Sequence, residues 1–169
     1  GVRKALHHAM TQPLKGNIAA FKRAARKAGS ILYLADNAGE IVFDRLLIEQ
    51  LEPGKVTVAV RGGPALNDAL LADARTAGLY KIAKVIDNGS DAPGTLLGQV
   101  CGDFRKEFLK AEMVVAKGMG NYETLSEAPR PVYFLFKAKC AMVAKRAGVP
   151  LGSQVLSFGG AKSRGKVAA

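Results

Sequence analysis

Short apolar runs alternate with amphipathic stretches along most of this chain. The runs are rich in β-branched and aromatic residues, which predicts buried strands. Between them apolar residues recur every three or four positions, which predicts helices of about 10 to 15 residues. The expected strands are 31–35, 56–60, 85–86, 113–116 and 131–136. Because strands separated by such helices pair in parallel, we expect a three-layer α/β/α, Rossmann-like domain with a mainly parallel sheet of at least five strands.

Turn and cap residues delimit the expected helices. Asn17 is a candidate cap for the first helix, and Gly29 is expected to end it. The expected helices are 17–28, 38–51, 67–77, 102–111 and 138–148. The first expected strand opens an α/β core over residues 31–156, and residues 157–169 are expected to form a basic, flexible tail.

Polar residues follow four of the expected strands. They are Asp36-Asn37 after the first strand, Arg61-Gly62-Gly63-Pro64 with Asn67-Asp68 after the second, Asp87-Asn88-Gly89 after the third, and Lys117-Gly118-Met119-Gly120-Asn121 after the fourth. In a parallel sheet these strand ends share one edge, where open α/β sheets bind their ligands. We therefore expect the four groups to converge although they are far apart in sequence.

The chemistry of these groups suits phosphoryl transfer. Carboxylate and amide oxygens bind hard divalent ions such as Mg²⁺ or Mn²⁺, while Lys117 and Arg61 offer positive charge for a phosphate. Two other interpretations remain open. Asp36, Asn37 and Asp68 could simply cap helices. Gly118-Met119-Gly120 could begin a dinucleotide-binding motif, although Glu123 stands where the third glycine belongs.

The positive charge of the chain is confined to its two ends. The 169 residues carry a formal net charge of +11, yet all 14 acidic residues lie between Asp36 and Glu127. Residues 1–35 hold seven Lys and Arg, and residues 128–169 hold eight. No aromatic or glycine-rich recognition module accompanies these basic residues, so we expect a solvated helix face and a basic tail, with no nucleic-acid partner.

Other classes of protein leave no signal in the sequence. No apolar stretch approaches the length of a membrane span, so no membrane partner is expected. The two cysteines, Cys101 and Cys140, share no motif spacing, which favours a reduced, cytoplasmic setting.

Four motifs in order resemble those of the DUF89 family of metal-dependent damage-control phosphatases, in particular its archaeal and bacterial stand-alone branch. The resemblance runs from about Gly16 to Leu156 and is carried by Asp36-Asn37-Ala38-Gly39-Glu40, Arg61-Gly62-Gly63-Pro64 with Asn67-Asp68-Ala69, residues 87–95, and residues 117–124. It implies hydrolysis of phosphomonoesters, either sugar phosphates or damaged phosphometabolites, with Mn²⁺, Co²⁺, Ni²⁺ or Mg²⁺ as cofactor.

The resemblance also implies roles for single residues. Asp36, Asn37 and Asp68 match the metal ligands, and Lys117 matches the lysine that holds the substrate phosphate. Glu40, Asn67, Gly120 and Asn121 match further motif positions, and Arg61 is expected to assist Lys117. We expect Asp36 or Glu40 to accept the proton of the attacking water.

The resemblance departs from the family at the amino-terminal side, where members carry a helical region. Residues 1–30 are therefore expected to be a remnant of that region, and apolar surface is expected where it would pack, with self-association as one consequence. The competing interpretation is a non-catalytic nucleotide- or nucleic-acid-binding module.

Overall fold

A seven-stranded sheet forms the centre of the protein. The computed structural model describes residues 3, 7 and 10–160. Across the sheet the strands follow the order β1-β7-β6-β5-β2-β3-β4. Their bounds are β1 Leu14–Lys15, β2 Ile31–Leu34, β3 Val56–Val60, β4 Lys84–Asp87, β5 Met113–Lys117, β6 Val132–Lys137 and β7 Gln154–Gly159. The helices are α2 Ile18–Lys27, α3 Ile41–Gln50, α4 Leu71–Thr76, α5 Gly102–Lys110, α6 Gly118–Leu125 and α7 Ala141–Ala147, with short 3₁₀ turns at Pro53–Lys55 and Leu79–Lys81.

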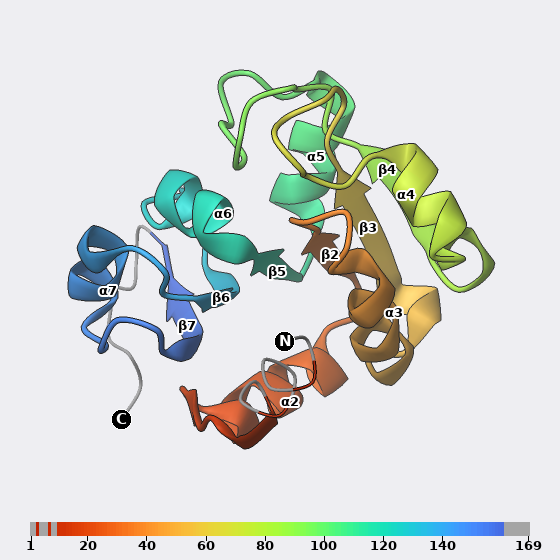
Figure 1. Ribbon diagram of the computed structural model, residues 1–169. Helices are drawn as coiled ribbons and strands as arrows, with labels where there is room; N and C mark the ends of the chain where they lie inside the picture. The colour runs from red at the N-terminus through yellow and green to blue at the C-terminus, as the bar shows by residue number, and fades with distance from the viewer. Residues whose placement is uncertain (1–2, 4–6, 8–9, 161–169) are drawn as a thin grey trace.

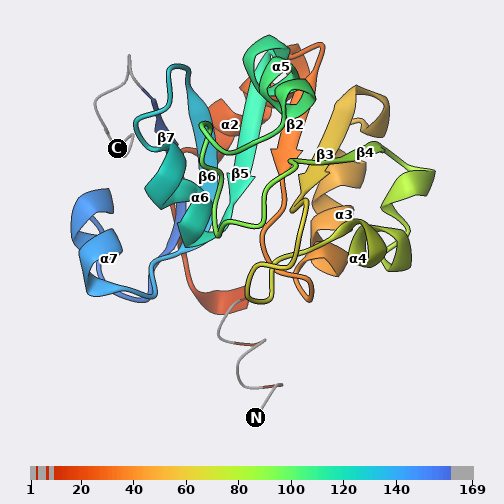
Figure 2. The same cartoon turned by 90° about the horizontal axis from the view of Figure 1, so that it is seen from above.

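The sheet is mainly parallel, as the sequence predicts. β2 pairs in parallel with both β3 and β5, β3 with β4, and β5 with β6. In Figure 2 these strands point toward one edge of the molecule. β7 is the exception because it runs antiparallel to β6, and on its other side it pairs in parallel with β1.

Helices cover both faces of the sheet and make three layers (Figure 1). Strand β2 shows why, since its alternate side chains enter opposite cores: Ile31 and Tyr33 pack with α2, α3 and α4, whereas Leu32 and Leu34 pack with α5, α6 and α7. All four residues of β2 are buried. A strand buried on both faces reads as a continuous apolar run, which confirms the predicted fold class.

The structure corrects the expected boundaries at both ends of the core. β1 belongs to the sheet, and α2 buries Phe21 and Ala25 in the core, so residues 14–28 are part of the α/β fold and not of a separate helical remnant. β7 continues to Gly159, so the expected tail does not begin at residue 157. The remainder of that tail, residues 161–169, lies outside the described residues.

Two further features bear on the sequence-based expectations. Both cysteines are exposed free thiols. Within residues 10–160, every helix is too short or too polar to span a lipid bilayer.

Candidate functional site

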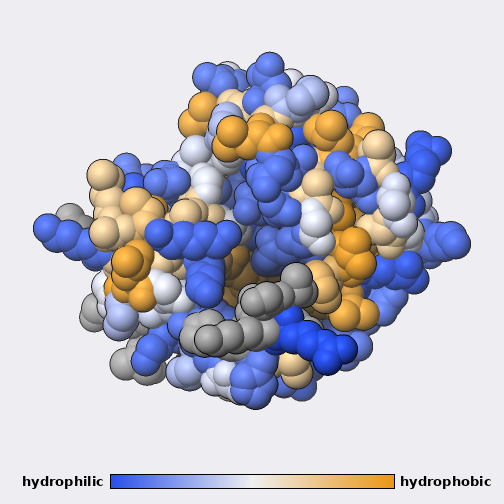
Figure 3. Space-filling view, viewed as in Figure 1, coloured by the Kyte–Doolittle hydropathy of each residue, from blue (hydrophilic) through white to orange (hydrophobic). Residues whose placement is uncertain are grey.

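The candidate site lies where the order in which the chain adds strands to the sheet reverses, beside β2. From β2 the chain proceeds to β3 and β4 on one side, and it then returns to place β5 on the other side of β2. Such a switch point leaves a crevice beyond the carboxyl ends of the two central strands. Asp36 follows β2 by two residues, and Lys117 is the last residue of β5. Figure 3 shows the surface hollowed on this side of the molecule.

Backbone pairing holds the loop after β3 against the segment after β2. Asn37 and Asp68 form an isolated antiparallel bridge. The amide of Ala69 donates to the carbonyl of Asp36 at 2.7 Å, and the amide of Ala38 donates to the carbonyl of Asn67 at 2.9 Å. This pairing brings Asp36, Asn37 and Asp68 together, as the convergence of strand ends predicts.

The helix-capping interpretation is wrong for Asp36 and Asp68, and Asn37 caps only the turn that precedes α3. Glu40 occupies the cap position of α3, and Leu70 occupies that of α4. The Asn37 Oδ1 atom instead accepts from the amide of Gly39 at 2.7 Å, which tightens the turn between β2 and α3. Asp36 and Asp68 are therefore not used by the helices that follow them.

Arg61 is committed to partners within the protein. Its Nε donates to Asp68 Oδ2 at 2.6 Å, and its two terminal nitrogens donate to Thr95 Oγ1 and Asn121 Oδ1, each at 3.2 Å. The guanidinium is buried. This geometry favours a role in orienting Asp68 over the direct phosphate contact expected for Arg61.

Asn121 is buried in α6 and completes this network. Its Oδ1 also accepts from Thr95 Oγ1 at 2.7 Å, and its Nδ2 donates to the carbonyl of Lys117 at 2.8 Å. Asn121 thus ties the start of α6 to the end of β5 and to Arg61. Its position favours a structural role over the expected substrate contact.

Lys117 lies between two carboxylates of α3. Its side chain continues the alternation of Met113 and Val115 and therefore points to the face of the sheet that α3 covers. Nζ is 2.6 Å from Glu40 Oε1 and 2.6 Å from Asp44 Oδ1. Burial alone would lower the pKa of Lys117, but the charges and hydrogen bonds of Asp44 and Glu40 outweigh it and raise that pKa above its ordinary value. Lys117 is therefore a firmly charged ammonium.

The Asp36 carboxylate is electrostatically frustrated. Burial, together with the charges of Asp68 and Glu40, raises its pKa from 3.8 to about 6, because Arg61 and Lys117 oppose that rise only in part. Within residues 10–160 no hydrogen bond to this carboxylate is found. A cation beside a half-buried carboxylate of this kind stabilises its charged form.

These residues fit a divalent cation. Asp36, Asp68, Glu40 and Asp44 are four carboxylates against two cations, Arg61 and Lys117, an excess of two negative charges. Asp36, Asp68 and Asn37 supply the oxygen atoms that Mg²⁺ and Mn²⁺ prefer. Among the described residues no cluster of three or more His, Cys, Asp or Glu side chains could hold a metal. A metal here would therefore rely on two carboxylates, one amide and water, as Mg²⁺ commonly does.

A cleft of about 590 Å³ opens at this edge. Its lining residues with functional side chains or glycine backbone are Asp36, Asn37, Glu40, Asn67, Asp68, Gly94, Gly118, Gly120, Glu123, Lys137 and Lys139. Asn67 and Gly120 are thus among the residues that line the cleft. Lys137 and Lys139 were missed by the sequence reasoning. Lys137 is the last residue of β6 and Lys139 follows it, so the rule that identified the other strand ends could have found them.

Comparison with known proteins identifies the family. The family model for the damage-control phosphatase ARMT1-like domain matches residues 2–155. An uncharacterized protein of Methanocaldococcus jannaschii is 48% identical over 132 residues, which are 75% of this chain and 43% of that protein. A damage-control phosphatase of Pyrococcus horikoshii is 43% identical over 134 residues, 77% of this chain and 47% of the relative. A damage-control phosphatase of Archaeoglobus fulgidus is 43% identical over 132 residues, 76% of this chain and 46% of the relative.

The fold agrees with these relatives. The crystal structure of a DUF89 family protein from Pyrococcus horikoshii superposes with a TM-score of 0.85 at 37% identity, covering 92% of this chain and 56% of that one. The chain spans about half the length of the curated relatives it matches. With the four motifs placed around one cleft, the protein belongs to the damage-control phosphatase ARMT1-like family, also called DUF89.

Proposed function

We propose that the protein is a metal-dependent phosphatase that hydrolyses phosphomonoesters of small metabolites. The observation that carries the proposal is the frustrated Asp36 carboxylate, which faces Asp68 across a bridged loop at the mouth of a cleft. Family membership supports phosphatase chemistry, since two of the relatives are named damage-control phosphatases. Sugar phosphates and damaged phosphometabolites are the substrate class we propose.

Asp36, Asn37 and Asp68 would hold the cation. When bound, a divalent ion supplies positive charge at a phosphate oxygen and makes a nearby water more acidic. Mn²⁺, Co²⁺, Ni²⁺ and Mg²⁺ are the candidates. Arg61 fixes Asp68 through the 2.6 Å contact between Nε and Oδ2, so the orientation of one proposed ligand does not depend on the metal itself.

Positive charge for the phosphate would come from several places around the cleft. Lys137 and Lys139 are exposed and line it. Lys117 keeps one of its three ammonium protons beyond its contacts with Glu40 and Asp44. The start of α6 at Gly118 also opens into the cleft, and helix starts favour anions.

Glu40 is the proposed acceptor for the proton of the attacking water. It lines the cleft, its side chain is 41% exposed, and only Oε1 is engaged by Lys117. The second oxygen is therefore open to a water in the cleft. Asp36 remains the other candidate when it is not occupied by a cation.

The decisive experiment measures phosphate release from a panel of phosphate esters in the presence of each metal and after chelation. We expect turnover with at least one metal and none with excess chelator. Asp68→Ala and Asp68→Asn should each lower metal-dependent turnover by at least about 100-fold, because both remove a proposed metal ligand. Circular dichroism checks that each variant is folded.

Asp103→Asn is the matched control. Asp103 lies on α5, is 93% exposed, and within residues 10–160 pairs only with Lys106, three residues away. Its substitution should leave turnover within about twofold. Unchanged turnover in Asp68→Ala would sink the assignment, and tight salt-dependent DNA binding without hydrolysis would favour the binding-module alternative.

A further inference from the structure

A line of four polar groups runs from the core of the sheet to the cleft. The Tyr33 hydroxyl donates to Asp44 Oδ1 at 2.8 Å, and the same oxygen accepts from Lys117 Nζ at 2.6 Å. Lys117 in turn reaches Glu40 at 2.6 Å, and Glu40 lines the cleft. Tyr33 and Asp44 do not line the cleft, since they are 0% and 2% exposed. They connect to it only through Lys117 and then Glu40.

Helix geometry explains why the ammonium fits here. Glu40 and Asp44 are four residues apart and lie one above the other on the same face at the start of α3. Two like charges in this spacing repel each other. The Lys117 ammonium, arriving from β5, sits between them and removes that repulsion. The sheet and the helix thus hold the cation from two sides.

The arrangement costs stability. Burial raises the pKa of the Asp44 carboxyl above its ordinary value even though Lys117 and Tyr33 oppose the change. Asp44 Oδ2 is buried and has no hydrogen-bond partner among the described residues. An apolar side chain at this position would avoid both costs, because buried ion pairs are commonly no more stable than apolar packing of similar volume. The core of the protein therefore gains little from Asp44.

We propose that Asp44, with the Tyr33 hydroxyl, is a positioning residue for Lys117. It holds the ammonium beside Glu40, at the depth where its remaining proton can meet a substrate phosphate, and it keeps the ammonium from pairing with Asp36. The inference rests on the proposed phosphatase function for its catalytic consequence. The position of the ammonium itself can be measured without any activity.

The first measurement is the ammonium signal of Lys117 in protein labelled with ¹⁵N at lysine, assigned by its loss in Lys117→Met. We expect a sharp, slowly exchanging signal in the unmodified protein, because the side chain is only 10% exposed and makes two short contacts. Asp44→Asn should broaden or abolish that signal. Tyr33→Phe, which keeps the ion pair, should shift it by less.

The second measurement is steady-state kinetics beside Mn²⁺ binding by calorimetry. Asp44→Asn should lower kcat about 10- to 100-fold, as expected for the loss of a hydrogen bond to a charged group, while Mn²⁺ affinity changes less than about threefold. Tyr33→Phe should lower kcat by about two- to fivefold. A merely structural role would instead lower Mn²⁺ affinity, kcat and melting temperature together. Asp103→Asn and Tyr80→Phe, at exposed positions, are the controls.

The outcomes separate cleanly. A retained ammonium signal in Asp44→Asn, or a lost signal with unchanged kcat, overturns the positioning role. If Asp44→Asn does not fold, Tyr33→Phe decides the question, since an unchanged signal and unchanged kcat there would also contradict it. Failure of the unmodified protein to hydrolyse any phosphate ester would overturn the proposed function instead, and the ammonium signal would still test the placement of Lys117.

Discussion

At the scale of single residues, the site consists of charges that the protein alone does not neutralise. Arg61 forms an ion pair with Asp68, and Lys117 forms ion pairs with Glu40 and Asp44. Among the described residues, Asp36 therefore has no ion-pair partner. Its pKa of about 6 reports this imbalance. Groups with such perturbed pKa values in clefts are characteristic of functional sites.

Replacing Asp36 with Asn should stabilise the metal-free protein near neutral pH. The folded-state pKa is raised from 3.8 to about 6, so the charged carboxylate costs folding free energy once the pH exceeds both values. Below about pH 4 the side chain is protonated in both states and the variant should match the parent. Between these limits the advantage should grow to about 1–2 kcal/mol, discounted for the partial exposure of the group.

The measurement is urea unfolding in excess chelator at several pH values between 4 and 8. The same variant should have lost metal-dependent turnover, which would make Asp36 a residue kept for function at the expense of stability. An advantage that is constant across the pH range would show that the carboxylate is not the cause.

Site residues at strand ends could be predicted from the sequence, whereas site residues inside helices could not. Asp36, Asn37 and Asp68 follow apolar runs, so their convergence could be predicted. Asp44 sits within the apolar pattern of α3, where nothing in the spacing distinguishes a buried acid from a solvated one. The internal partners of Arg61 lie 7, 34 and 60 positions away, and such pairings depend on tertiary contacts that one sequence does not reveal.

At the scale of elements, the start of α6 decides how closely β5 approaches the site. Gly118 has φ +80°, and a Cβ atom there would collide with the Asp36 carboxylate. Glycine is therefore required at position 118 for two reasons: the backbone is left-handed, and the Asp36 carboxylate approaches it closely. Without that approach, α6 could not present its first turn to the cleft.

Gly118→Ala should abolish metal binding and turnover, because the new methyl group displaces Asp36. Gly148→Ala is the matched control, since Gly148 ends α7 with φ +68° but has nothing within 4 Å of an added Cβ. The control should lose only about 1–2 kcal/mol of stability to backbone strain and keep its activity. Calorimetric Mn²⁺ titration and thermal unfolding of both variants provide the comparison. Equal behaviour of the two would contradict the proposed contact.

Elements with strong local preferences were predicted well, and those made by tertiary contacts were not. The β-branched run 56–60 and the helix 102–110 lie where the pattern put them. No helix was expected at residues 118–125, where two of the first three residues are glycines and glycine is a poor helix former. There, α6 is stabilised by the burial of Asn121, Tyr122 and Leu125. β7 was missed because its pairing with β6, not its own composition, makes it a strand.

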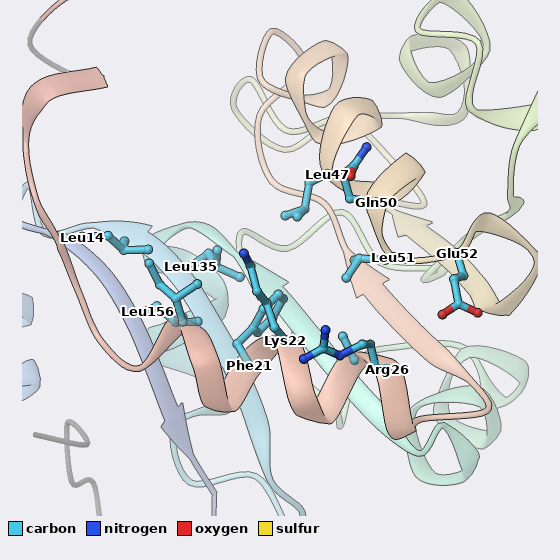
Figure 4. Close-up of a pocket in the computed structure, with 12 residues that line it drawn as sticks. Leu14, Phe21, Lys22, Arg26, Leu47, Gln50, Leu51, Glu52, Leu135 and Leu156 are labelled. Atoms are coloured by element: carbon cyan, nitrogen blue, oxygen red, sulfur yellow. The ribbon is translucent and has the colours of Figure 1, made fainter.

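At the scale of the whole molecule, helix α3 exposes several large apolar side chains. Val42, Phe43 and Leu46 of α3 are exposed, at 55%, 64% and 61%. Beside them an apolar groove of about 340 Å³ lies between α2 and α3, lined by leucines of several elements and by Phe21, with Lys22 and Arg26 at its rim (Figure 4). Large exposed apolar surfaces are uncommon on monomers and are typical of contacts with another protein.

The isolated chain should therefore associate in a concentration-dependent manner. Sedimentation velocity over a range of concentrations is the measurement. Phe43→Lys combined with Leu46→Lys should shift the population toward monomer, because charge is introduced at the centre of the apolar surface. Leu109→Lys is the control, since Leu109 is 58% exposed on α5, across the sheet. A monomer at every concentration would mean that this surface is tolerated in water.

The pairing of β1 with β7 determines when β1 can join the sheet during synthesis of the polypeptide. Leu14 lies opposite Gln154 in the sheet, so β1 cannot take its place until β7, far later in the chain, has been synthesised. β7 must also insert between β1 and β6, so β1 is connected to the rest of the sheet only after β7 is in place. Because contacts this distant in sequence slow folding, nascent chains should keep the surface of α2 accessible to chaperones until β7 has been synthesised.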